Sequence, residues 1–155
     1  MNDENQLKAA LSKAMALCAA YEYCSSDIRS RLNSWGISSV DADKIISELI
    51  REQFVNDTRY ALAFVKDKYN HNKWGKVKIA AGLRLKKINE ETIVRALDEI
   101  DEDQYLTMIR DTINSHRKFV KAKNKYELKG KLLRFGLSRG FESHLLYDIL
   151  SDFEL

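Results

Sequence analysis

The fold of this chain is decided by a stretch that reads Ile28-Arg29-Ser30-Arg31-Leu32-Asn33-Ser34-Trp35-Gly36-Ile37. Its apolar positions are four and then five residues apart, and two more follow after nine and three residues. The same series occurs three times. The copies are Ile28, Leu32, Ile37, Ile46 and Leu49; Ile79, Leu83, Ile88, Leu97 and Ile100; Leu128, Leu132, Leu137, Leu146 and Ile149. Because a spacing of four places two side chains on one helical face, each copy predicts two helices joined by a turn.

The turn inside each copy has a signal of its own. Gly36 and Gly136 occupy the matching position in the first and third copies, and Lys87 occupies it in the second. Glycine is favoured there because a helix commonly ends in a residue of left-handed conformation. The copies start 51 and then 49 residues apart, which leaves room for a third helix in each.

We therefore expect an all-α fold, a tandem repeat of three three-helix modules that is elongated and curved. The modules are expected over residues 1–54, 55–102 and 103–155. A chain of 155 residues with no proline and six glycines favours nine helices with short connections. Those with predicted bounds span about residues 6–21, 25–35, 39–52, 56–69, 76–86, 89–100 and 103–121. The last helix is expected to be capped by Ser138, after a turn at Gly136.

Composition restricts the class of protein. A hydrophobic content of 45% and a charged content of 32% are typical of a soluble folded chain. No apolar run approaches the roughly 18 residues of a membrane span, and the first residues lack the regions of a secretory signal. We expect a cytoplasmic protein without membrane contact.

Cys18 and Cys24 are six residues apart and are interpreted as reduced thiols, at least one of them packed inside.

No pattern in the sequence predicts an enzyme, a cofactor or a metal site. His71, His116 and His144 lie far apart and lack ligand spacing. The acidic run Asp101-Glu102-Asp103 is better explained by a helix start, where carboxylates favour the macrodipole, than by magnesium. Trp35 and Trp74 each precede a glycine at a helix boundary, which favours packing anchors over base-stacking platforms.

Two basic blocks carry most of the positive charge. Residues 66–87 contain eight basic residues against one acid, and residues 117–139 contain nine against one. The candidate binding residues are Lys73, Lys76, Lys78, Arg84, Lys86 and Lys87, with Arg117, Lys118, Lys121, Lys125, Lys129, Lys131 and Arg134 second. Such cations bind phosphate backbones without reading sequence. An ordinary solvated helical face is an equally good interpretation of the charge alone.

Residues 54–65 read Phe-Val-Asn-Asp-Thr-Arg-Tyr-Ala-Leu-Ala-Phe-Val, and residues 74–79 read Trp-Gly-Lys-Val-Lys-Ile. Together they resemble the central signature of the RecX family, in which an Asp, an Arg-Tyr pair and an Ala-x-x-Phe-Val run precede a glycine turn and a basic helix. Residues 23–37 resemble the family's first module. Lys76 replaces a frequent proline, and Trp35 replaces a lysine.

The resemblance implies a tandem three-helix repeat and a regulator of the RecA recombinase. Such a protein binds RecA filaments on DNA and restrains filament growth, ATP hydrolysis and strand exchange. We expect a monomer that lies along the groove of the filament, with single- or double-stranded DNA as a further partner. The motif residues Asp57, Arg59, Tyr60 and Phe64 are interpreted as structural: Asp57 as a helix N-cap, Arg59 in a local ion pair, and the rings at core spacing. The alternative is a sequence-independent DNA-binding repeat protein that competes for single-stranded DNA.

Overall fold

The computed structural model describes residues 2–153, and within this range it contains helices and no strand. Its nine helices are α1 (Asn2–Ala20), α2 (Ser25–Ser34), α3 (Ser39–Arg51), α4 (Asp57–Asn70), α5 (Lys76–Leu85), α6 (Glu90–Leu97), α7 (Glu102–Arg117), α8 (Lys125–Ser138) and α9 (Ser143–Ser151). The all-α expectation is confirmed. None of the helices in residues 2–153 is long and apolar enough to cross a membrane.

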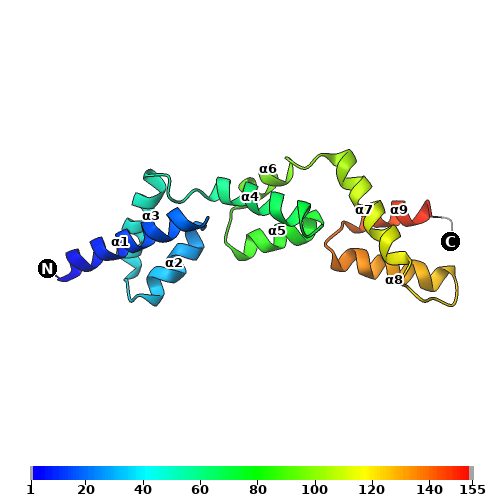
Figure 1. Ribbon diagram of the computed structural model, residues 1–155, viewed down its shortest axis with the longest axis horizontal. Coiled ribbons are helices and arrows are strands. Elements are labelled where there is room, and N and C mark those ends of the chain that lie inside the picture. The colour runs from blue at the N-terminus through cyan, green and yellow to red at the C-terminus, as the bar shows by residue number, and fades with distance from the viewer. Residues whose placement is uncertain (1, 154–155) are drawn as a thin grey trace.

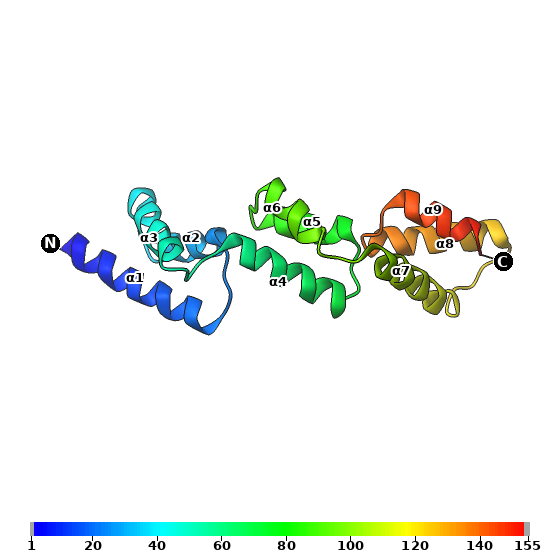
Figure 2. The same ribbon diagram turned by 90° about the horizontal axis from the view of Figure 1, so that it is seen from above.

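The helices form three sets of three along one axis, with α1 and α9 toward opposite ends of the molecule (Figure 1). In each set the first helix packs against one or both of the other two. The first helices α1, α4 and α7 follow one another along one side when the molecule is seen from above (Figure 2). The expectation of an elongated tandem repeat is therefore confirmed.

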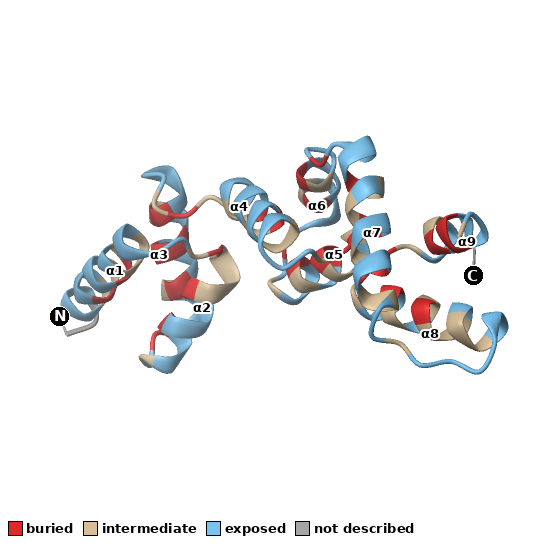
Figure 3. Cartoon of the chain, turned by 45° about the vertical axis from the view of Figure 1, so that its right-hand side comes forward, coloured by how far each residue is buried: buried red, intermediate tan, exposed pale blue. Residues whose placement is uncertain are grey.

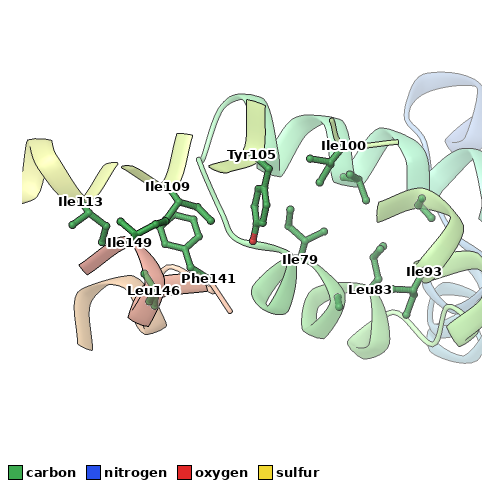
Figure 4. Packing of buried hydrophobic residues seen from close by; sticks show 14 of the residues in the cluster. Ile79, Leu83, Ile93, Ile100, Tyr105, Ile109, Ile113, Phe141, Leu146 and Ile149 are labelled. Carbon is green, nitrogen blue, oxygen red and sulfur yellow. The ribbon is translucent and has the colours of Figure 1, made fainter. Parts of the chain in front are cut away.

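Buried residues lie between the helices of each set, and solvent reaches the outer faces (Figure 3). The first module has a core of its own, which includes Ile28, Leu32 and Leu49. The second and third modules share one continuous core from Ile79 to Ile149, with Tyr105 and Phe141 between them (Figure 4). The second and third modules are therefore joined by a shared apolar core.

The turn between the first two apolar runs has the predicted conformation in modules one and two. Gly36 has φ 79° and Lys87 has φ 60°. In both modules the next residue closes the turn onto the helix, because the Ile37 N–H donates to the Leu32 carbonyl at 3.0 Å and the Ile88 N–H to the Leu83 carbonyl at 3.1 Å. A non-glycine residue is strained in this conformation, so Lys87 occupies an unfavourable position.

The prediction for the third module was wrong by one helical turn. Gly136 lies inside α8, and the left-handed residue is Gly140, with φ 90°. The Phe141 N–H closes that turn onto the Gly136 carbonyl at 3.1 Å, and Phe141 is buried whereas Leu137 is 46% exposed. Ser138 ends α8, where its hydroxyl donates to the Phe135 carbonyl at 2.6 Å, and it does not cap α9, which begins at Ser143 with Glu142 at its N-cap.

The length of α8 explains the error. It has 14 residues where α2 and α5 have 10, so four residues are added and the apolar series shifts by four. The residues with the common spacing are Leu132, Gly136, Phe141, Leu150 and Phe153. The copy read from Leu128 is therefore four residues out of register with the other two, although its Leu132, Leu146 and Ile149 are buried in the core.

Helix starts were predicted more accurately than helix ends. Side chains of Ser38, Asn56 and Asn89 cap α3, α4 and α6 by accepting a backbone N–H three residues later. Three bounds differ from the expectation by three or four residues: α1 starts at Asn2, four residues earlier, α6 ends at Leu97, three residues earlier, and α7 ends at Arg117, four residues earlier. Ends are less certain in a sequence because fraying and irregular last turns leave weaker signals than a capping side chain.

Candidate interaction surface and the joints between modules

The joint between modules one and two is made where the N-terminus of α2 meets the C-terminal turn of α5. The Ser26 hydroxyl donates to the Lys86 carbonyl at 2.6 Å. The Lys86 ammonium reaches back to Asp27, with Nζ 2.8 Å from Oδ1. The hydrogen bond to Asp27 raises the pKa of Lys86. Lys86 is thus a structural cation at a joint.

Two motif residues belong to the same joint. Asp57 accepts from the Ser25 N–H at 2.8 Å and from the Ser25 hydroxyl at 3.1 Å. Arg59 pairs with Glu22, 37 residues earlier, at 2.9 Å, and donates to the Gln53 carbonyl at 3.2 Å. The expected roles are corrected accordingly: Asn56, not Asp57, is the N-cap of α4, and the ion pair of Arg59 is not local. Helical spacing could not predict these partners, because they belong to another module.

The joint between modules two and three repeats this arrangement with backbone groups. The Gly75 N–H donates to the Arg139 carbonyl at 2.7 Å, and the Val77 N–H to the Gly140 carbonyl at 3.0 Å. The chains approach so closely that a Cβ on Gly75 would lie 2.2 Å from the Gly140 backbone. A Cβ on Gly140 would lie 2.2 Å from the Cβ of Lys78. Both glycines are required by this contact.

Tyr105 is the buried centre of the second joint (Figure 4). Its hydroxyl accepts from the Lys76 N–H at 2.9 Å and donates to the Glu142 carboxylate. Burial and the hydrogen bond to Glu142 raise the pKa of Tyr105 far above its usual value. The Lys76 ammonium is 2.9 Å from Glu102 and lies over the Tyr105 ring.

Both joints share one plan. The first residue of the second helix contacts the first residue of the next module's first helix: Ser25 with Asp57, and Lys76 with Glu102. The C-terminal turns of α5 and α8 face the N-termini of α2 and α5, so the helix dipoles follow head to tail. Unpaired N–H groups at a helix start thereby find acceptors. The arrangement keeps successive modules at a repeated spacing.

The remaining motif residues pack inside module two. Tyr60 and Phe64 stack with ring centroids 6.1 Å apart, and Phe64 meets Trp74 edge to face at 6.4 Å. Phe64 needs the space left by Gly82, where a Cβ would lie 2.8 Å from the ring. Burial raises the pKa of Tyr60, with the Asp27 carboxylate contributing.

Four of the candidate binding cations are held in ion pairs. They are Lys76 with Glu102, Arg84 with Glu90, Lys86 with Asp27, and Lys131 with Glu127. The Glu90 and Glu127 pKa values are lowered by these cations. Lys76, Lys78 and Lys86 are only partly exposed, which differs from the expectation that the whole block faces solvent.

Eight candidates have no ion pair within residues 2–153. They are Lys73, Lys78, Lys87, Lys118, Lys121, Lys125, Lys129 and Arg134. Lys87 lies at the first joint, next to Lys86. Lys78 lies at the second joint, against Gly140 and over the Trp74 ring at 4.5 Å. Arg117 lies over the Phe153 ring. The cations that remain available are therefore placed at both joints and around the start of α8.

Sequence reasoning missed the partners that hold the joints, namely Glu22, Ser25, Asp27, Glu102 and Glu142. Their positions in the repeat were the available signal, since Ser25 and Lys76 each begin the second helix of a module. Among residues 4–153, no group of three His, Cys, Asp or Glu side chains is placed to hold a metal. His116 instead stacks on Phe135 with centroids 3.6 Å apart. Cys18 and Cys24 are free, and burial raises the pKa of both thiols.

Comparisons with known proteins agree with this architecture. The family model described as RecX, second three-helix domain, matches residues 56–97. Regulatory protein RecX of Clostridium botulinum (strain Eklund 17B) is 31% identical over 129 residues, which cover 81% of this chain and 59% of the relative. The protein of that name in Clostridium acetobutylicum is 27% identical over 154 residues, covering 97% and 71%. The chain thus spans about six tenths of the length of the first of these relatives.

Solved structures show the same fold. A crystal structure of regulatory protein RecX superposes with a TM-score of 0.89 at 20% identity, covering 98% of this chain and 74% of the other. That of RecX from Lactobacillus salivarius gives 0.85 at 18% identity, covering 96% and 97%. This chain is therefore similar to RecX proteins over most of its length: the family model matches its central module, the named relatives match along most of the chain, and the solved structures share its fold.

Proposed function

We propose that this protein is a regulator that binds the RecA filament on DNA and restrains filament growth, ATP hydrolysis and strand exchange. The relatives that match along most of the chain are named regulatory proteins, which supports a regulatory role. The observation that carries the proposal is the placement of cations without an ion pair at both joints of an elongated array, Lys87 at the first and Lys78 at the second. A filament offers a partner surface that repeats along its length, as this array does.

The mechanism we propose is bridging. One protein contacts neighbouring RecA subunits and DNA through its modules, and its joints resist changes in their spacing. A ligand shifts an equilibrium only when it binds one state more tightly than the other. By holding one filament geometry, the protein disfavours the rearrangements that ATP turnover requires. The proposal includes action as a monomer, in the cytoplasm, without a catalytic residue or cofactor of its own.

The test follows ATP hydrolysis and binding on RecA-coated and bare single-stranded DNA over a salt series. Lys78→Gln, Lys87→Gln and Lys118→Gln are combined, which removes three unpaired cations but leaves the ion-paired ones. The matched control removes three exposed cations elsewhere, by Lys8→Gln, Lys66→Gln and Arg110→Gln. We expect the first variant alone to need roughly tenfold more protein for half-inhibition, equivalent to about 1.4 kcal/mol.

The result also separates this function from its competitor. A protein that merely competes for DNA binds bare strands at least as well as filaments and loses affinity steeply with salt. Preference for the coated strand with slowed hydrolysis supports the regulator. Equal inhibition by the two triple variants would contradict the assignment of this surface.

A further inference from the structure

A groove of about 780 Å³ lies between α8 and α9, at the end of the molecule farthest from α1 (Figure 1). Its lining includes Tyr126, Lys129, Gly130 and Arg134 from α8, and Tyr147 and Leu150 from α9. The two helices pack against each other, and their exposed sides form the walls. This groove belongs to neither joint.

The lining of the groove includes a glycine, Gly130, that packing does not explain. Glycine in a helix interior is destabilising relative to alanine, so its presence needs a reason. At Gly82 the reason is the Phe64 ring, and at Gly136 it is Leu146, whose Cδ2 would lie 2.5 Å from a Cβ. A Cβ on Gly130 would meet only a guanidinium nitrogen of Arg134, at an ordinary 3.7 Å. Gly130 therefore leaves open space in the groove.

Two tyrosines present their rings at this groove. Tyr126 is 89% exposed and Tyr147 is 61% exposed, although they come from different helices. Other tyrosines of the chain, such as Tyr60 and Tyr105, are packed against the core. Exposed aromatic rings beside an apolar floor provide faces on which flat rings can stack.

The charge of the groove is positive. Lys129 and Arg134 line it, and neither has an ion pair within the described part of the chain, residues 2–153. The acid in its lining, Glu127, is engaged by Lys131 at 3.1 Å and by the Lys123 N–H. The segment before α8 adds exposed cations, including Lys121 and Lys125. The ligand that fits is anionic and carries flat apolar rings.

The groove depends on the turn that α8 has in addition to α2 and α5. Tyr126 lies in that added turn, which has no counterpart in the first two modules. The N-termini of α2 and α5 are covered at the joints by a C-terminal turn of the next module. Figure 3 shows that the first turn of α8 is exposed instead.

We infer that this groove binds single-stranded nucleic acid, with a base stacked on Tyr126 or Tyr147 and the adjacent phosphates held by Lys129 and Arg134. Proteins that bind single strands combine these two features, a basic groove and aromatic rings. A duplex is a poorer ligand because its bases already stack on one another. The inference goes beyond the proposed regulation, since this contact forms without RecA.

The first test measures the fluorescence anisotropy of a labelled oligothymidylate titrated with the full chain, without RecA. The combined Tyr126→Ala and Tyr147→Ala variant is expected to bind at least about tenfold more weakly. Tyr21→Ala is the matched control, because Tyr21 is 71% exposed on module one. The salt slope of the double variant is expected to match that of the wild type, since no charge is removed. Unchanged affinity of the double variant would overturn the inference.

Two further measurements separate stacking from charge alone. An oligomer of abasic sites has the same phosphates and no bases, and it is expected to bind as weakly as the double tyrosine variant. Gly130→Leu fills the groove without removing a charge, and it is expected to weaken oligothymidylate binding while thermal unfolding stays at or above the wild-type temperature. Equal binding of the abasic oligomer and oligothymidylate would show that phosphates suffice, and it would refute the base contact.

The outcomes for this groove and for the proposed function are distinguishable. Loss of filament inhibition in the tyrosine variant with intact binding of free oligothymidylate would mean that the groove takes a protein partner, contrary to the inference. Loss of oligothymidylate binding with intact inhibition supports the groove and leaves the regulator proposal standing.

Discussion

Asp57, the first residue of α4, accepts two hydrogen bonds from Ser25, the first residue of α2, at 2.8 Å from its backbone nitrogen and 3.1 Å from its hydroxyl. The carboxylate of one module therefore satisfies the N-terminal donor of a helix in another. The core of module one is separate except for Cys24, which is buried in the core of modules two and three, so this contact is part of what couples the folding of module one to the rest of the array.

Removing that carboxylate is expected to uncouple module one. Asp57→Ala leaves the Ser25 N–H without its acceptor, and we expect a loss of about 1–2 kcal/mol in the free energy of unfolding. In a repeat protein, a weakened interface lets modules unfold separately. Urea unfolding followed by circular dichroism should show a broader or two-step transition.

The matched control is Asp103→Ala, because Asp103 is an exposed acid in the first turn of α7. It should change stability by a few tenths of a kcal/mol at most. Equal effects of the two substitutions would mean that Asp57 acts through the dipole of α4 and not through Ser25.

Gly75→Ala is expected to disrupt the second joint. The added Cβ would lie 2.2 Å from the backbone of Gly140, where no flexible side chain can move aside. We expect a destabilisation of about 1–3 kcal/mol, as for other overpacked sites. Gly130→Ala, the control within a helix, has open space and should stabilise by about 0.5–1 kcal/mol. Thermal melts of the two variants that shift in the same direction would contradict the close approach at Gly75.

Lys87→Gly is expected to stabilise the protein. Lys87 has φ 60°, which costs an L-residue about 1–2 kcal/mol and glycine much less. We expect a net gain of roughly 0.5–1 kcal/mol in chemical denaturation, since glycine also adds unfolded-state entropy. Lys87→Ala removes the same cation without relieving the conformation. If alanine stabilises as much as glycine, the gain comes from charge and not from the backbone.

Tyr105→Phe should change how stability depends on pH. The native state raises the pKa of Tyr105, so the folded phenol keeps its proton above pH 10 while the unfolded one, near 10.0, loses it. Stability is therefore fully present below pH 10 and falls as pH rises, by about 1.4 kcal/mol per pH unit for one proton.

The Tyr105→Phe variant lacks this dependence of stability on pH. At neutral pH we expect its free energy of unfolding to be about 1–2 kcal/mol lower than that of the wild type, because the Lys76 N–H is left without an acceptor. The difference in the free energy of unfolding between the variant and the wild type should become smaller above pH 10. Tyr60 and Lys86 also have raised pKa values, but they contribute equally to both proteins. If the difference in the free energy of unfolding stays constant from pH 7 to pH 11, the result would be inconsistent with a buried phenol at the joint.

Local patterns predicted much of the fold because their physical causes are local. The Ser38, Asn56 and Asn89 caps act on a backbone N–H three residues later, so they are visible in sequence. The third turn was misplaced because periodicity cannot distinguish a helix from one that is four residues longer. The close contact of Gly140 with Lys78, across modules, determines where that turn lies.

The candidate binding surface was also predicted only in part from the sequence. Sequence alone determined an all-α chain of three three-helix modules, its two basic blocks and its family resemblance, because spacing and charge are properties of neighbouring residues. Only the tertiary structure decided which cations are available. Lys86 and Lys76 are held by Asp27 and Glu102, which are 59 and 26 residues away. Such pairs form when helices from different modules meet end to end, and that meeting is set by the packing of whole modules.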